Sequence, residues 1–433
     1  MKKIINLNIV ALLLLVIISF SSCQKDWGNL NSPTIEEFLD NASAPELNNL
    51  VIGTLSGLRN NEALYLDDVG VIGREMYRFS GADPRYETDL PGSSPLSNTG
   101  FYLTNPWGSR YRVVKNCNVL IDASNNSTLI SEAEKKAYNG FAKTIKAYAL
   151  LLNLNLTYTN GIRVEVSDPE NLGPFLGYDE SLTAIAGLLD DAQADLNGAS
   201  LTFPLPGFTG LSDAAGFTKV NRALAARVAV YRQKWTDALT DLDGSFFSMN
   251  ALFNVGAYNV FGTGSGDQLN IAYFPQNQNG EVRVAHPSYA EDIEAGDDRI
   301  EKATLRDVPY SSSGLTGDRD VWVYTSSTDP IPIIRNEELI LISAEANIQT
   351  GNLNTAVGAL NVIRNGHNLP NYSGAVTKEA LVDEMLNQRR YSLFFEGHRW
   401  IDMRRYGKLN ELPVDRADDQ VWDKMPIPLT EQQ

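Results

Sequence analysis

Residues 345–360 read EANIQTGNLNTAVGAL, and residues 227–239 read RVAVYRQKWTDAL. The two regions can be aligned with an offset of 118 residues. Each then has a small residue just before the quoted stretch, a bulky residue nine positions later and an alanine three positions after the bulky residue. The aligned pairs are Ala226 and Ala344, Trp235 and Leu353, and Ala238 and Ala356. Small residues let two antiparallel helices approach closely, so each region is predicted to form a helical hairpin.

Apolar periodicity predicts further helices along most of the chain. Asn105-Pro106 is typical of a helix start, and Ser131 with Glu134 matches a capping box. The predicted helices cover about 105–121, 131–160, 179–197, 218–233, 332–350, 352–365 and 377–395. Irregular segments are expected over about 60–104, 199–217 and 244–330. The predicted fold class is dominated by α-helix: a scaffold of hairpins that resembles tetratricopeptide repeats, with long loops and a few short strands.

Composition narrows the classes of function. The chain has 433 residues, 43% of them hydrophobic, and a formal net charge of −17. Such a chain is globular and repels phosphate backbones, so nucleic acid is not expected as a partner. Its three histidines are scattered and it has only two cysteines, so neither a metal centre nor a disulfide framework is predicted, and no cofactor.

The N-terminus resembles a bacterial lipoprotein signal. Lys2 and Lys3 precede the apolar run 9–18, which is too short to span a membrane. Small residues then lead to Cys23. The sequence therefore predicts a signal peptide over 1–22 and a lipidated Cys23 that anchors the mature chain to a membrane.

The C-terminal third resembles the SusD/RagB family. Residues 335–346 (RNEELILISAEA), 388–407 (QRRYSLFFEGHRWIDMRRYG) and 425–428 (MPIP) carry the resemblance, which extends over nearly all of the mature chain. It implies one SusD-like domain over 23–433, with an N-terminal part 23–240 and a C-terminal part 241–433. It also implies a lipoprotein on the outer face of the outer membrane that captures oligosaccharides for a SusC-like TonB-dependent transporter.

No catalytic residue is predicted. Glu396, Arg399 and Asp402 lie in a dense charge cluster, which is interpreted as an ion-pair network that fixes a helix end. Gly397 would permit an unusual backbone angle there. Asp297-Asp298 and Asp318 with Asp320 are candidate calcium ligands, but solvated acids are the favoured interpretation because no calcium-loop signature is present.

Sugar capture needs aromatic faces and a few polar groups, preferably on loops. The first candidates are Trp322 and Tyr324, which are expected to share one face of a strand because residues 321–324 alternate. A second group in the early irregular segment contains Asp83, Arg85, Tyr86 and Tyr102. Weaker candidates are Tyr289 and Tyr310. Core positions are expected for Trp107, Trp235 and Trp400.

Three other functions remain open from sequence. The same fold could capture peptides or another small nutrient. A surface glycoside hydrolase would require a carboxylate pair at a defined separation, which cannot be singled out among 53 acids. A purely structural protein would cap the transporter and bind no ligand.

Overall fold

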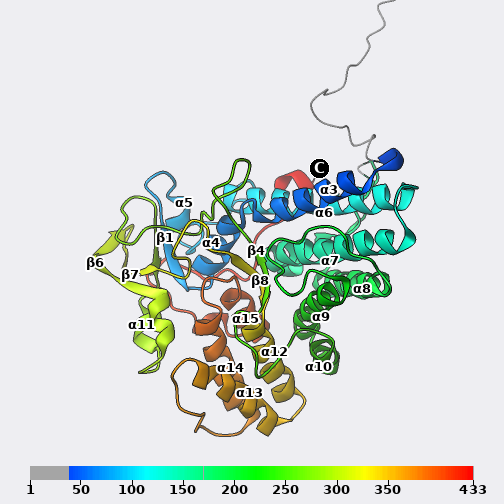
Figure 1. Cartoon of the computed structure of the whole chain (residues 1–433). Coiled ribbons are helices and arrows are strands. Elements are labelled where there is room, and N and C mark those ends of the chain that lie inside the picture. Colours follow the sequence, from blue (N-terminus) through cyan, green and yellow to red (C-terminus); the bar gives the residue numbers. More distant parts are fainter. Residues whose placement is uncertain (1–38, 169, 433) are drawn as a thin grey trace, which may run out of the picture.

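The computed structural model describes residues 39–168 and 170–432. The predicted signal peptide and Cys23 lie outside the described residues. Helices dominate the described chain (Figure 1), as predicted. They are α3 (Ala44–Arg59), α4 (Glu62–Ile72), α5 (Arg85–Thr88), α6 (Phe101–Asn126), α7 (Glu132–Thr157), α8 (Tyr178–Leu196), α9 (Ala214–Tyr231), α10 (Trp235–Asp243), α11 (Ser288–Asp292), α12 (Asn336–Gln349), α13 (Leu353–Gly366), α14 (Lys378–Ser392) and α15 (Arg399–Arg405).

The two predicted hairpins are confirmed as α9–α10 and α12–α13. Their turns have matching geometry. Gln233 and Gly351 occupy equivalent positions and both adopt left-handed backbone angles, with φ of 57° and 83°. Their amides donate to Val230 O and Ile348 O at 3.0 and 3.2 Å, again equivalent positions. The shared spacing therefore reflects a shared structure, in which the small residues lie at buried helix contacts.

One of the two helix starts predicted from the sequence is confirmed, and the other is wrong. The capping box at Ser131 is present, and Glu134 N donates to Ser131 Oγ at 3.3 Å. The predicted start at Asn105-Pro106 is wrong, because α6 begins at Phe101 and contains Pro106. Proline removes one helical hydrogen bond, whereas burial of Leu103 and its neighbours in the core stabilises the extra turn.

The segment 60–104, which the sequence predicts to be irregular, contains α4. Every residue of α4 is buried, including Glu62, Asp67 and Asp68. A helix enclosed on all sides has no polar face, so its sequence lacks the amphipathic period that reveals most helices. It contacts α6 and α15, which places these acids deep in the protein.

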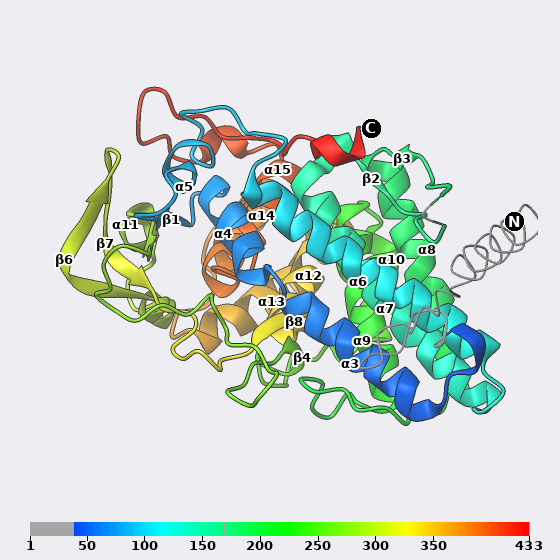
Figure 2. The same ribbon diagram turned by 90° about the horizontal axis from the view of Figure 1, so that it is seen from above.

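A four-stranded antiparallel sheet, in the order β1-β5-β7-β6, lies at the opposite end of the molecule from α8–α10 (Figures 1 and 2). Two smaller strand pairs are β2 with β3 and β4 with β8. The strands are β1 (Met76–Phe79), β2 (Ile162–Arg163), β3 (Phe175–Leu176), β4 (Gly256–Asn259), β5 (Val282–Ala285), β6 (Ala303–Ser312), β7 (Leu315–Val321) and β8 (Ile331–Arg335). Because β7 ends at Val321, the prediction that Trp322 and Tyr324 share a strand face is wrong.

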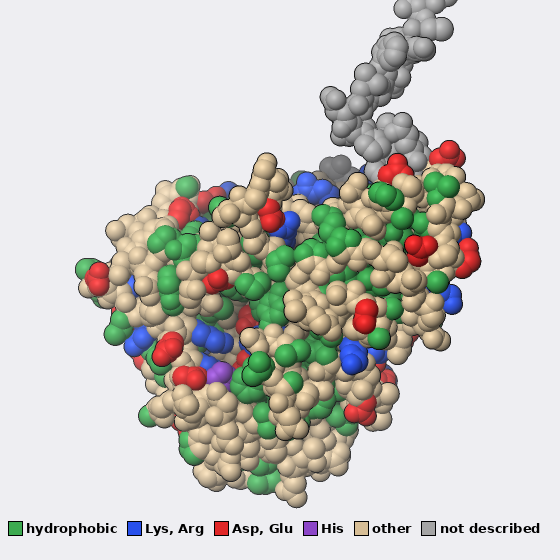
Figure 3. Space-filling view, viewed as in Figure 1, with side chains coloured by type: hydrophobic (Ala, Val, Ile, Leu, Met, Phe, Trp, Pro, Cys, Tyr) green, Lys and Arg blue, Asp and Glu red, His purple; other side chains and the backbone are tan. Residues whose placement is uncertain are grey.

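Figure 3 shows hydrophobic side chains at the surface over the middle of one face, with charged side chains scattered around them. Among the helices that the structure describes, none has both the length and the apolar character needed to cross a membrane.

Glu62 gives α4 a testable pH dependence. Burial raises the pKa of its carboxyl to about 7, although Arg110 and Asn259 oppose the shift. The folded state therefore holds the proton more tightly than the unfolded state, and this stabilisation is lost as the pH rises through about 7. We expect wild type to lose roughly 2–3 kcal/mol of stability between pH 5 and pH 8.5 through this group. Glu62→Gln should remove that loss in urea unfolding.

The exposed Glu379→Gln is the control and should follow the wild-type pH dependence. Parallel wild-type and Glu62→Gln curves would show that Glu62 does not titrate in this range.

Candidate functional site

Two arginines lie directly opposite each other on neighbouring strands. The register of β1 and β5 pairs Arg78 with Arg283. Like charges facing each other across a strand pair are destabilising. Here the buried Asp67 of α4 lies with both: it accepts hydrogen bonds from Arg283 at 2.6 and 2.9 Å and forms an ion pair with Arg78 at 3.4 Å. The fully buried helix thus provides the carboxylate that makes the arginine pair tolerable.

Both arginines lie close to one aromatic ring. The guanidinium groups of Arg78 and Arg283 lie 5.0 and 4.1 Å from the centroid of the Phe274 ring. Arg78 also lies 4.8 Å from the ring of Tyr86. Planar guanidinium groups stack well on aromatic faces, so Asp67 indirectly fixes the orientation of both rings.

Further half-buried rings extend this cluster in both directions. Tyr86 contacts Phe101 with ring centroids 5.0 Å apart. Tyr273, the chain neighbour of Phe274, contacts Trp322 at 6.0 Å. We call the five residues the aromatic row: Phe101, Tyr86, Phe274, Tyr273 and Trp322. All five are half-buried, so they combine fixed positions with accessible edges or faces.

Polar groups border the row. Asp83 accepts two hydrogen bonds from the Arg85 side chain, at 2.9 and 2.6 Å, and these bonds hold the pKa of Asp83 below its usual range. Arg85 in turn lies 4.6 Å from the Phe101 ring. Apolar C–H faces of a sugar can stack on such rings while its hydroxyls bond to the flanking charged groups.

The structure thus places four of the predicted binding residues in or beside the aromatic row: Asp83, Arg85 and Tyr86 near Phe101, and Trp322 against Tyr273. Two other predicted binding residues, Tyr102 and Tyr324, are buried below the surface. Tyr102 is fully buried, and its hydroxyl donates to Asp89 at 2.8 Å. Tyr324 is also buried, with its hydroxyl 3.4 Å from Phe395 O. Neither ring can offer a face to a ligand in this structure, and alternation alone could not reveal their burial.

Sequence reasoning missed three members of the row: Phe101, Tyr273 and Phe274. The adjacent aromatic pair at 273–274 within a segment expected to be irregular was the available signal. Core positions are confirmed for Trp107 and Trp400. The core prediction for Trp235 is wrong, because this side chain is only half-buried. Of the weaker candidates, Tyr289 is buried and Tyr310 packs on Phe79, with ring centroids 4.9 Å apart.

The predicted ion-pair network near the C-terminus is confirmed at Glu396 and Asp402, whereas Arg399 has no ion pair or hydrogen bond among the described residues. Glu396 accepts hydrogen bonds from Arg335 at 2.9 and 2.8 Å, and Asp402 accepts one from Arg389 at 2.6 Å. Gly397 has a φ of 84°, which confirms the unusual backbone angle predicted for this glycine. These acids hold arginines in place.

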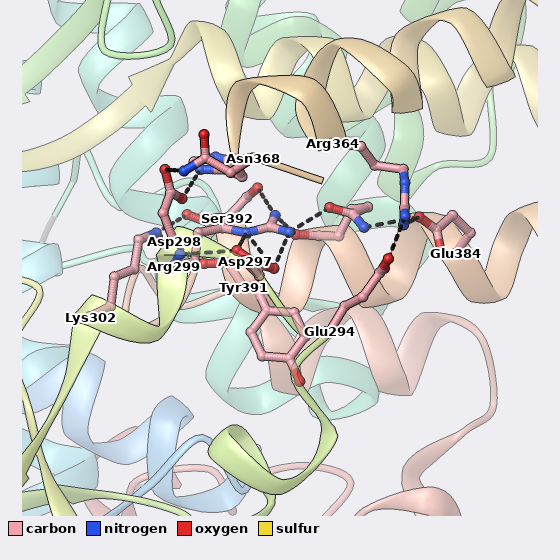
Figure 4. Close-up of polar contacts among 12 residues, drawn as sticks. Glu294, Asp297, Asp298, Arg299, Lys302, Arg364, Asn368, Glu384, Tyr391 and Ser392 are labelled. Atoms are coloured by element: carbon pink, nitrogen blue, oxygen red, sulfur yellow. Dashed lines mark hydrogen bonds and ion pairs between the residues drawn. The ribbon is translucent and has the colours of Figure 1, made fainter. Parts of the chain in front are cut away.

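The candidate calcium ligands Asp297 and Asp298 have protein partners (Figure 4). Asp297 binds the buried Arg299, whose guanidinium also reaches Ser392 at 2.9 Å. Asp298 contacts His367 at 2.8 Å. Among the described residues, no group of three or more His, Cys, Asp or Glu side chains is arranged to hold a metal ion.

Comparison with known proteins shows a family match over part of the chain. Residues 297–429 match the SusD family. The SusD-like protein P38 of Formosa agariphila is 33% identical over 107 residues, which span 21% of this chain and 21% of that relative.

Solved structures extend the likeness in fold to most of the chain. Surface glycan-binding protein A from Bacteroides thetaiotaomicron, in complex with laminarihexaose, has a TM-score of 0.71 at 13% identity and covers 90% of this chain and 97% of its own. A SusD superfamily protein from Bacteroides vulgatus has a TM-score of 0.69 at 17% identity, covering 90% and 96%. The resemblance to the SusD/RagB family is therefore confirmed: residues 297–429 match the family, and the described chain has the SusD-like fold.

Proposed function

We propose that this chain is a surface glycan-binding protein that captures oligosaccharides on the aromatic row. The observation that carries the proposal is the set of five half-buried rings fixed by stacked arginines and bordered by polar groups. Capture of this kind involves binding without any covalent step. Because the rings are already held in position, little conformational entropy should be lost when the ligand binds. A solved structure of the same fold contains laminarihexaose, which supports this ligand class.

The finer parts of the proposal concern location and partner. Lipidation of Cys23 would anchor the protein to the outer membrane with its binding surface facing the exterior. The captured oligosaccharide would pass to a SusC-like TonB-dependent transporter. The SusD family match supports this arrangement, and the predicted division into 23–240 and 241–433 remains part of it.

Trp322→Ala and Tyr86→Ala should each weaken oligosaccharide binding about 10-fold, because each removes one anchoring ring. Titration calorimetry of residues 24–433, which include every described residue, against a glycan panel measures the effect. Tyr372→Ala, at a half-buried ring on the loop between α13 and α14, is the matched control and should bind like wild type.

Other outcomes would redirect the assignment. Release of shorter saccharides during the titration would indicate a surface glycoside hydrolase. Saturable binding of peptides alone would indicate the same fold serving another nutrient. Unchanged glycan binding in both ring variants would remove the aromatic row as the site.

A further inference from the structure

A cavity lined by aromatic rings lies on elements that do not contribute to the aromatic row. Its volume is about 560 Å³, within the range typical of small-ligand sites. It opens where α7, α9 and α12 end and where α14 begins. Both helical hairpins contribute their turns, through Gln233 of the first and Gln349 of the second. Five rings line it: Tyr158, Tyr178, Tyr231, Trp235 and Tyr406.

The rings of this cavity are held in place and one polar group is unsatisfied. Tyr158 and Tyr178 meet edge to face with centroids 4.6 Å apart, and Arg404 lies 4.2 Å from the Tyr158 ring. Tyr406 donates to the buried Glu345 at 2.8 Å. The Tyr178 hydroxyl is buried and has no hydrogen-bond partner among the described residues. An unpaired buried hydroxyl is costly to the folded state.

An adjoining pocket of about 400 Å³ shares Asp383 and Lys408 with this cavity. Lys408 lies 3.2 Å from Asp383 and 2.7 Å from Glu411, so both acids already have a cationic partner. Arg399 also lines the pocket, and within the described part of the chain it has neither a hydrogen bond nor an ion pair.

The isolation of Arg399 is unusual for its surroundings. From the same C-terminal segment, Arg389 and Arg405 each bind a carboxylate, at 2.6 and 2.8 Å. Burial, together with the nearby Arg390, lowers the pKa of Arg399 to about 10, which still leaves it charged at neutral pH. A half-buried, charged guanidinium without a partner can donate hydrogen bonds to a ligand carboxylate.

We propose that this cavity is a second ligand site for a short acidic saccharide, with a sugar ring against the tyrosines and Trp235 and a carboxylate paired with Arg399. The five rings supply stacking faces for the sugar, and Arg399 supplies the charged group for its carboxylate. The site depends on none of the residues of the aromatic row, so either site can fail without the other.

The test compares matched acidic and neutral sugars. Residues 24–433 are titrated with trisaccharides of galacturonic, glucuronic, mannuronic and guluronic acid, and with their neutral hexose counterparts. We expect at least one acidic trisaccharide to bind. Arg399→Gln should weaken that binding about 10- to 100-fold, as loss of a charge-assisted pair implies, and change neutral-sugar binding less than twofold. Trp235→Ala should weaken it as well, whereas Trp322→Ala should not.

Thermal unfolding checks that each variant is folded, and Arg399→Lys should recover part of the affinity by restoring the charge. Lys115→Gln, at an exposed position of α6 outside the cavity, is the charge-loss control and should change binding less than twofold. Failure of every acidic trisaccharide to bind would overturn the proposal, as would acidic binding that survives Arg399→Gln and Trp235→Ala but is lost in Trp322→Ala.

Discussion

Replacing Asp67 by alanine is expected to destabilise the protein by about 3–5 kcal/mol and to weaken oligosaccharide binding more than 10-fold. Asp67 is buried and bonded to both nitrogens of the Arg283 fork. Without it, Arg283 loses its carboxylate partner and Arg78 keeps only Glu281, so the two arginines repel each other across the paired strands. Both arginines contact Phe274, so the repulsion should also displace the centre of the aromatic row.

Urea unfolding and glycan titration at 15 °C measure the two effects. If Asp67→Ala does not fold, Asp67→Asn keeps the shape and one acceptor and should show a smaller loss of both. Asp297→Ala is the matched control, since it also breaks a buried aspartate–arginine pair but lies outside the row. It should lose stability and keep its affinity for glycans. Equal losses of affinity in Asp67 and Asp297 variants would mean that binding merely follows stability.

Gly161→Ala is expected to destabilise the protein by about 3 kcal/mol or more. Gly161 has a φ of 72°, and a Cβ there would lie 1.8 Å from Leu176 O. The clash involves backbone on both sides, so no side-chain rotation can relieve it. Gly161 follows Tyr158–Asn160 and lies opposite strand β3, which is followed closely by Tyr178. Gly161→Ala should therefore also disturb the cavity that Tyr158 and Tyr178 line.

Gly198→Ala separates backbone strain from the clash. Gly198 has the same φ of 72°, but no atom lies within 4 Å of the position that a Cβ would take, so only the conformational cost of about 1–2 kcal/mol should appear. Chemical unfolding of the two variants gives the comparison directly. Similar destabilisation in both would show that the β2–β3 connection moves aside to accept a side chain.

Local spacing predicted the helical hairpins well because their signal is contained within each segment. The small residues at Ala226 and Ala344 and the capping box at Ser131 act over a few helical turns. The same reasoning failed for α4, whose complete burial erases any periodic pattern, and for Trp322 and Tyr324, whose alternation does not continue as a strand.

The class of fold, the family resemblance and several polar and aromatic residues of the candidate site, including Arg85 and Tyr86, could be predicted from the amino-acid sequence. Which rings are accessible, and which lie together, depends on how distant segments pack. Phe101, Phe274 and Trp322 come from distant segments, and their proximity depends on the register of β1 with β5 and on Asp67 beneath that pair. The cavity lined by Tyr158 and Tyr178 likewise forms where the ends of several helices, distant along the chain, lie close together. Aromatic stacking and ion pairing join residues that are distant along the chain, so the periodicity of a local segment cannot predict them.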